Sequence, residues 1–223
     1  MEKVKQQSNF TYKNENSRHK KHTRNFIVDK LKELSLDPIH YCGLPALSPV
    51  LEEYLLANYQ DLKMFLAEGV KPLVFKEQKK MFKGKAGVYQ EIVHYYGNLL
   101  TAPIGFRLNL IWFDLCGMLT RDTLDQMFSF FQQNALMSKG LFAITWSACR
   151  EKGNQTNLYS QLQDRYGKTS FESLKDFKHN QLPEIFVKML SEASGQSFKS
   201  EFSYQYKDRG TMLMQFNALS WGT

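Results

Sequence analysis

The run LNLIWFDLCGML at positions 108–119 is the most strand-like stretch of the chain, and the rest is interpreted outward from it. Residues 108–114 are largely apolar and end in a single acid, Asp114, which is typical of a strand buried on both faces of a sheet. Apolar side chains at helical spacing then predict a helix over 120–137. Residues 139–148, KGLFAITWSA, predict the next strand. Strand, helix and strand in this order favour parallel pairing.

The same alternation continues toward both ends of the chain. It predicts an α/β protein with a mostly parallel sheet, helices on both faces and a C-terminal antiparallel β-hairpin. On the N-terminal side we expect helices at 22–34 and 49–68, strands at 39–46, 72–76 and 92–98, and helical turns within 79–91. On the C-terminal side we expect helices at 158–166 and 180–193 and a hairpin of strands 198–206 and 211–219.

Positive charge is concentrated at the N-terminus. The chain carries a net charge of +7, of which residues 1–25 hold +5 and the other 198 residues +2. We expect residues 1–21 to be a basic arm, disordered up to Ser17, and residues 22–223 to form a single domain. Two interpretations of the arm stay open, a solubilising tail and a segment that contacts nucleic-acid phosphates. The phosphate contacts would come from Arg18, Lys20, Lys21 and Arg24.

Several classes of protein are excluded or disfavoured by the sequence. No apolar run is long enough to span a bilayer, and the N-terminus lacks the apolar core of a secretory signal. The three cysteines, Cys42, Cys116 and Cys149, cannot all pair within the chain and form no C-x-x-C motif. We therefore expect an intracellular protein with no membrane partner and no metal site. The absence of G-x-G-x-x-G and Walker-type loops argues against a nucleotide-dependent oxidoreductase and an NTPase.

Candidate ligand-binding residues lie in the turns that follow the predicted strands. In open parallel sheets, ligands bind beyond the carboxyl ends of the strands, near the switch in strand order. The turns are Cys42-Gly43-Leu44-Pro45-Ala46, Glu77-Gln78, Gly97-Asn98, Asp114-Leu115-Cys116-Gly117 and Thr145-Trp146-Ser147.

Five βα units followed by a hairpin, over about residues 36–221, resemble the Rossmann-like fold of class I S-adenosylmethionine-dependent methyltransferases. The resemblance implies S-adenosylmethionine as cofactor. It implies that the turn Cys42–Pro45 with its Gly43 approaches the cofactor, that Glu77, followed by Gln78, holds the ribose, and that Gly97-Asn98 holds the adenine. It also implies that Asp114, followed by Leu115, ends strand four at the cofactor. The first turn departs from the family pattern, because it has a single glycine and Pro45 lacks an amide donor.

The turn after strand four carries a narrower resemblance. FDLCGML followed by GLFAIT is similar to the DPFG-type turn and following strand of the tRNA guanine dimethyltransferase family. Asp114 and Gly117 match that pattern, whereas Leu115 and Cys116 depart from it. The turn is not the NPPY or DPPY motif of amino-methylating DNA enzymes, so base methylation is suggested by the resemblance alone.

Two residues of this turn carry alternative chemical interpretations. Asp114 is our candidate catalytic residue, as proton acceptor or as a hydrogen-bond partner of a target amine. The alternative is an acid that caps the helix beginning near Thr120. Cys116 is interpreted as a buried thiol, with a nucleophile as the alternative.

Two functions follow for the whole chain. The first is an S-adenosylmethionine-dependent methyltransferase acting on a DNA or RNA base. The alternative is a catalytically inactive methyltransferase-like subunit that binds nucleic acid or a partner protein.

Overall fold

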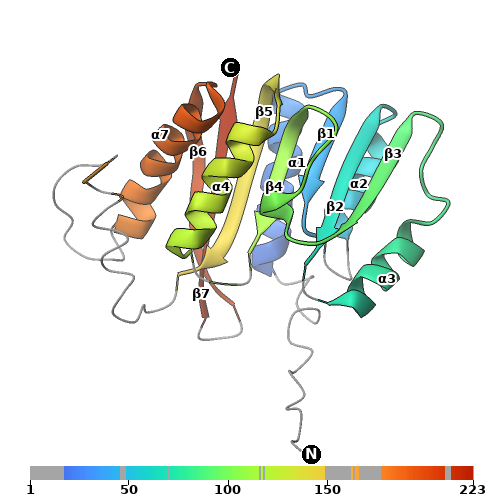
Figure 1. Cartoon of the computed structure of the whole chain (residues 1–223), viewed down its shortest axis with the longest axis horizontal. Helices are drawn as coiled ribbons and strands as arrows, with labels where there is room; N and C mark the ends of the chain where they lie inside the picture. Colours follow the sequence, from blue (N-terminus) through green and yellow to red (C-terminus); the bar gives the residue numbers. More distant parts are fainter. Residues whose placement is uncertain are drawn as a thin grey trace, which may run out of the picture.

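Seven strands form one sheet in the order β3-β2-β1-β4-β5-β7-β6 (Figure 1). The computed structural model describes residues 18–45, 49–69, 71–115, 117, 119–148, 162, 164–165, 177–208 and 212–222. Strands β1 to β5 are parallel to one another, and β7 runs antiparallel between β5 and β6. The strands are β1 (Ile39–Gly43), β2 (Leu62–Glu68), β3 (Gln90–Tyr96), β4 (Leu108–Asp114), β5 (Leu136–Ser147), β6 (Phe198–Asp208) and β7 (Met212–Trp221).

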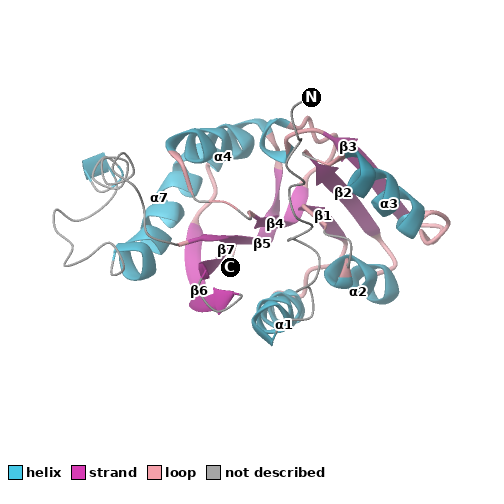
Figure 2. Cartoon of the chain, turned by 90° about the horizontal axis from the view of Figure 1, so that it is seen from below, coloured by secondary structure: helices cyan, strands magenta, loops and turns pink. Residues whose placement is uncertain are grey.

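Helices cover both faces of the sheet, as Figure 2 shows. Helices α1 and α2 lie on one face and α4 and α7 on the other, while α3 lies beside β3 at one end of the sheet. The helices are α1 (Arg18–Glu33), α2 (Val50–Asn58), α3 (Pro72–Phe82), α4 (Arg121–Gln133) and α7 (Leu182–Ser194), with short helical turns η1 (Leu99–Thr101) and η2 (Phe177–Gln181). The predicted fold class and the C-terminal hairpin within the main sheet are therefore confirmed.

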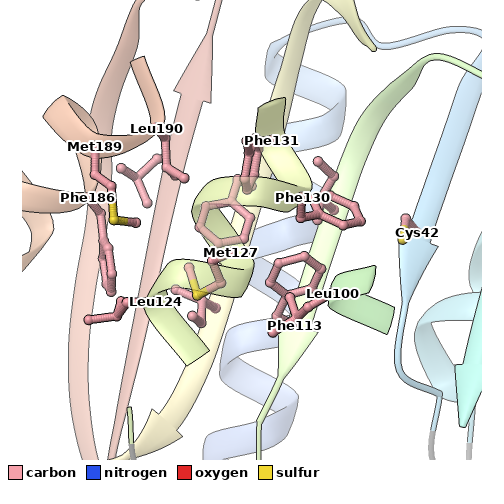
Figure 3. Packing of buried hydrophobic residues seen from close by; sticks show 14 of the residues in the cluster. Cys42, Leu100, Phe113, Leu124, Met127, Phe130, Phe131, Phe186, Met189 and Leu190 are labelled. Carbon is pink, nitrogen blue, oxygen red and sulfur yellow. The ribbon is translucent and has the colours of Figure 1, made fainter. Parts of the chain in front are cut away.

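Strand β4 has the predicted bounds, and both of its faces are buried. Its side chains alternate between two apolar layers, with Ile111 and Phe113 toward α4 and Leu110 and Trp112 toward α1. Phe113 packs edge-on against Phe130 of α4 at a centroid distance of 5.1 Å (Figure 3). Burial of these side chains is the main favourable contribution to folding.

The predicted helix over 49–68 is wrong in its second half. Helix α2 ends at Asn58, and residues 62–68 form strand β2, which lies between β1 and β3. Because β2 is a central strand, LKMFLAE buries apolar side chains toward both helix layers. A continuous apolar run without alternation does not distinguish a buried strand from a helix.

The predicted strand over 72–76 is also wrong, because these residues begin helix α3. Pro72 stands in the first turn of the helix, where its missing amide donor costs nothing. Val74, Gln78 and Phe82 are buried at a spacing of four, which is the period of one helix face. The short apolar segment PLVFK was interpreted as a strand because it is too short to show the helical period.

Helix α1 includes residues that were assigned to the basic arm. The helix spans Arg18–Glu33, four residues more than the predicted start at His22, so the densest basic cluster is helical. Residues 1–17, which precede the helix, carry a net charge of only +1. Most of the N-terminal charge therefore belongs to α1 rather than to the segment before it.

Some predictions fall on residues that the structure does not describe. The expected disorder of residues 1–17, most of the helix over 158–166, and Cys116 and Cys149 lie outside the described residues. Cys42 is fully buried, as expected, and burial raises the pKa of its thiol well above the ordinary value. None of the described helices is long and apolar enough to cross a membrane.

Candidate cofactor site at the carboxyl edge of the sheet

A cavity of about 250 Å³ opens at the carboxyl ends of the first four parallel strands. It gathers residues from the turns after β1, β2, β3 and β4, although these turns are far apart in the sequence. Four candidate residues of the sequence analysis line it, and apolar side chains form much of its wall. Its lining consists of Leu44, Gly69, Gly97, Asn98, Leu99, Leu100, Phe113 and Leu115.

The turn after β1 is shaped by Tyr41 rather than by an open glycine. A Cβ on Gly43 would lie 1.9 Å from the Tyr41 hydroxyl oxygen, so the glycine makes room for this side chain. The Tyr41 hydroxyl donates a 2.7 Å hydrogen bond to the buried Glu52 of α2. Burial, and then the charge of Glu52, raises the Tyr41 pKa well above its ordinary value, so the hydroxyl keeps its proton. Gly43 thus has a packing role in the described structure.

Glu77 does not end the second strand. It lies on the exposed side of α3, where Lys80 donates a 2.8 Å hydrogen bond to its Oε1. The acid at the end of β2 is Glu68, directly before Gly69 of the cavity wall. Glu68 Oε1 accepts a 3.1 Å hydrogen bond from the amide of Lys71. The acid predicted at the end of strand two is therefore Glu68, and the choice of Glu77 was wrong.

Gln78, the neighbour of Glu77, is drawn into the interior instead. Its side chain is fully buried, and its Nε2 donates a hydrogen bond to the carbonyl of Pro45. Its Oε1 is one of the buried polar atoms that have no hydrogen-bond partner within the described part of the chain. This hydrogen bond connects α3 to the turn after β1, so Gln78 stabilises the turn from the interior of the protein.

Asn98 lines the cavity, but both ends of its side chain are already used. Its Oδ1 accepts a 3.0 Å hydrogen bond from the amide of Leu100, which caps the η1 turn. Its Nδ2 donates a 2.8 Å hydrogen bond to Gln126 of α4. Asn98 thereby holds Leu99 and Leu100 against the cavity.

Asp114 ends β4 as predicted, beside the cavity-lining Leu115. Its Oδ2 lies 3.4 Å from the Lys20 ammonium of α1, and its side chain is 19% exposed. It does not cap α4, because the Thr120 hydroxyl accepts the 3.1 Å hydrogen bond from the amide of Thr123. The helix-capping alternative is therefore wrong, and Asp114 stands at the sheet edge paired with a lysine.

The four basic residues proposed for phosphate contact differ in access. Helical spacing turns Lys20 and Arg24 inward, where they are 13% and 7% exposed. Arg18 and Lys21 are exposed. Lys21 and Arg24 also line a pocket of about 380 Å³ between α1 and α2. The four residues do not form one outward-facing row.

No cluster of histidine, cysteine and acidic side chains among the described residues is arranged to hold a metal ion. The turn after β4, which resembles that of the tRNA guanine dimethyltransferases, stays a prediction, since Cys116 and Met118 fall within the undescribed part.

Sequence reasoning missed Glu68, Gly69, Leu99 and Leu100. Glu68 was the last residue of a predicted helix and Gly69 followed it directly, while the last two lay inside a stretch assigned to a loop. One signal was present, because the apolar residues 64–67 with Leu62 have the length of a strand and are followed directly by Glu-Gly.

Comparisons with known proteins support the fold. No family profile matches the chain, and no curated protein matches it. Among solved structures, a protein from Galdieria sulphuraria assigned as a sarcosine dimethylglycine methyltransferase has a TM-score of 0.56 at 12% identity, covering 91% of this chain and 86% of that one.

Two further solved structures are similar, with slightly lower TM-scores. The methyltransferase domain of bacterial CtHen1-CN has a TM-score of 0.51 at 12% identity, covering 90% of this chain and 98% of that one. Magnesium protoporphyrin IX methyltransferase from Synechocystis PCC 6803, solved with bound S-adenosylhomocysteine, has a TM-score of 0.52 at 10% identity, covering 90% and 83%. The chain thus has the Rossmann-like fold of class I methyltransferases.

Proposed function

We propose that the chain is an S-adenosylmethionine-dependent methyltransferase that acts on nucleic acid. The observation that carries the proposal is the cavity at the carboxyl edge, where the turns after four strands meet beside Glu68. Ligands of open α/β sheets bind at such edges. The solved structures most similar in fold include methyltransferases, one of them with bound S-adenosylhomocysteine.

The residues of the cavity fit the adenosine half of the cofactor. Leu99, Leu100 and Phe113 supply an apolar surface for a flat ring, and Gly69 and Gly97 leave room for its approach. Glu68 stands where a carboxylate can accept hydrogen bonds from ribose hydroxyls. At about 250 Å³ the cavity is smaller than the usual 300–1,000 Å³ of small-molecule sites, so it accounts for part of the cofactor.

When bound, the cofactor supplies an electrophilic methyl group. Asp114 provides the carboxylate at this edge, either to accept a proton or to hold an attacking amine by a hydrogen bond. Lys20 lies 3.4 Å from Asp114 and brings the first turn of α1 over the end of β4. In either role Asp114 must exchange its contact with Lys20 for a contact with the methyl acceptor.

The nucleic-acid acceptor is inferred from charge. The chain has a net charge of +7, which favours polyanionic partners. The neighbours named for sarcosine dimethylglycine and magnesium protoporphyrin IX show that the fold itself does not select the acceptor.

Calorimetry with S-adenosylmethionine and S-adenosylhomocysteine tests the cofactor assignment. A competent site binds in the micromolar range, about −8 kcal/mol. An absence of binding heat and of any thermal shift at millimolar ligand would contradict the proposal.

A second candidate is a catalytically inactive methyltransferase-like subunit that binds nucleic acid or a partner protein. The packing of Tyr41 over Gly43 favours it, because the turn has a single glycine whose missing side chain is already used within the fold. A protein that binds an oligonucleotide but neither form of the cofactor would support this candidate.

A further inference from the structure

A second concentration of positive charge lies at the other end of the sheet from the β6–β7 hairpin. Residues 71–85 hold six lysines and one glutamate, a net charge of +5 within fifteen residues. They include all of α3, which lies beside the edge strand β3 and begins at the carboxyl edge of the sheet (Figure 1). Outside α1 and residues 71–85 the chain carries a net charge of −2, so residues 71–85 are a localised basic segment.

The lysines of residues 71–85 differ in their pairing. Lys80 bonds Glu77 at 2.8 Å, and Lys85 bonds Glu53 at 3.0 Å. The other exposed lysines of this surface have no carboxylate within ion-pair distance among the described residues. These are Lys76, Lys79 and Lys83.

Aromatic rings lie between these lysines and the edge strand. Phe75 of α3 packs 5.4 Å from Tyr96 of β3, and the Lys79 ammonium lies 5.6 Å over the Phe75 ring. Phe82 packs 5.8 Å from His94, and Lys85 lies 6.0 Å over Phe82. Phe75 also lies 6.4 Å from His94, so the two sets of contacts adjoin, but Phe82 itself is buried beneath the helix.

Part of this aromatic surface is open to solvent. Tyr96 is 47% exposed and Tyr89, just before β3, is 76% exposed. The two tyrosines are about 23 Å apart along the extended edge. Tyr96 directly precedes Gly97, which lines the cavity, so the surface leads to the candidate cofactor site.

We propose that the α3–β3 edge, formed by Lys76, Lys79, Lys83, Tyr89 and Tyr96, binds single-stranded nucleic acid. Lysines contact phosphates, and exposed tyrosine rings stack on unpaired bases, the combination that sequence-tolerant single-strand binding uses. A duplex keeps its bases stacked and offers these rings nothing, so a single strand is favoured. The inference builds on the proposed function, because it names the surface that holds the acceptor strand.

The test measures binding of fluorescein-labelled oligonucleotides without cofactor, as RNA and as DNA of the same sequence, about 12 nucleotides long. The triple variant Lys76→Ala/Lys79→Ala/Lys83→Ala is expected to bind at least tenfold more weakly at low salt. Its plot of log affinity against log salt is expected to be shallower by about two, at about 0.7 per phosphate contact. Comparison of the two oligonucleotides shows whether the 2′-hydroxyl contributes.

A matched control removes three cations that lie away from the α3–β3 edge. Lys32→Ala/Arg107→Ala/Lys207→Ala changes the net charge equally, and all three side chains are exposed. This control is expected to keep wild-type affinity and salt slope. Equal losses in the two triple variants would overturn the proposal, because they would show that only overall charge matters.

Substitutions of Tyr96 test whether a tyrosine ring stacks on unpaired bases. Tyr96→Ala is expected to weaken oligonucleotide binding by about tenfold, whereas Tyr96→Phe keeps the ring and is expected to bind as the wild type. Equal binding by all three proteins would remove the tyrosine from the surface.

Two results separate this inference from its rivals. If wild-type protein binds phosphatidylserine vesicles but no oligonucleotide, and the patch variant loses vesicle binding, the surface is a membrane site and the proposal is overturned. If the protein binds S-adenosylmethionine but no oligonucleotide, the α3–β3 proposal fails while the methyltransferase assignment stands.

Discussion

Two acidic residues, Asp114 at the end of β4 and Glu68 at the end of β2, lie at the same edge of the sheet but have different partners. Asp114 lies 3.4 Å from the ammonium of Lys20, whereas Glu68 accepts a hydrogen bond from the amide of Lys71. The first partner belongs to a separate helix, and the second to the turn that follows the strand itself. Glu68 is held by the turn that follows its own strand, which favours a fixed contact with a ligand. Asp114 is held by a separate helix, which favours a residue that exchanges this partner for another.

Asp114→Asn is expected to abolish methyl transfer while leaving cofactor affinity within a few fold. The amide keeps the size of the side chain but cannot accept a proton or carry the charge of the carboxylate. Transfer of a labelled methyl group from the cofactor measures activity, and calorimetry measures affinity. Asp125→Asn on the exposed side of α4 serves as control, and full activity of Asp114→Asn would show that the carboxylate is dispensable.

Glu68→Gln is expected to weaken S-adenosylmethionine binding by about tenfold or more, as for a lost hydrogen bond to a charged group. The glutamine can still accept the hydrogen bond from the Lys71 amide, so the turn is preserved. The matched variant Glu77→Gln is expected to bind as the wild type, because Glu77 points into solvent on α3. Calorimetry on both variants decides which acid holds the cofactor, and the reverse order of effects would restore Glu77.

Among whole elements, α1 is fixed to the sheet by a charged contact near its C-terminal end. The Lys30 ammonium lies 2.6 Å from Glu201 of β6, and both side chains are largely buried. Burial alone would raise the pKa of Glu201, but hydrogen bonds from Lys30, Ser220 and Lys199 outweigh it and lower that pKa. Burial alone would likewise lower the Lys30 pKa, but hydrogen bonds to Glu201 and Glu33 raise it.

Glu201→Gln is expected to lower the free energy of unfolding by about 2 kcal/mol near neutral pH, because it weakens one of the two charged partners of Lys30 and leaves Glu33 as the other. The wild-type advantage is full above about pH 4.3, the ordinary glutamate value, and is lost as pH falls through the lower pKa of folded Glu201. Chemical unfolding at about pH 7 and pH 3 measures both values. A difference between the two proteins that stays constant with pH would contradict the assignment.

The elements also show which parts of the fold a sequence alone specifies. Residues 108–114 are apolar on both faces and end at an acid, and strand and bounds were predicted correctly. LKMFLAE has equally apolar faces but follows α2 after three residues, so the two elements were merged into one helix. PLVFK is too short to show a period, and only the buried Gln78 and Phe82 beyond it reveal the helix.

The same two errors account for the part of the site that was misplaced. Leu44, Gly97, Asn98 and Leu115 follow strands that were assigned correctly, and the cavity brings them together. Glu77 was chosen because it followed a strand that does not exist, and Glu68 was overlooked inside a helix that does not exist. Side-chain contacts between distant segments, such as Lys20 with Asp114, have no local signal in the sequence.

On the scale of the whole molecule, positive charge divides between α1 and residues 71–85 and leaves little before residue 18. Deleting residues 1–17, with a net charge of +1, is expected to leave the fold and cofactor binding intact and to change the salt slope of oligonucleotide binding by less than about one. A cut after residue 21 would instead remove the first turn of α1 and the contact of Lys20 with Asp114.

Salt titrations of full-length and shortened protein test this expectation. If the shortened protein loses as much affinity as the triple lysine variant, residues 1–17 make phosphate contacts and the expectation is wrong. Unchanged thermal unfolding after the deletion is the accompanying control.

Strand β7 has a consequence for how the protein is made on the ribosome. It follows the other six strands in sequence, yet it lies between β5 and β6, and within the described part of the chain β6 pairs with β7 alone. A nascent chain that ends before Met212 therefore presents β5 as an open edge and β6 as an unpaired strand. Folding during translation can bury α1 to β5 but must wait for the last strand to close the sheet, and until then the growing chain is exposed to edge-to-edge association.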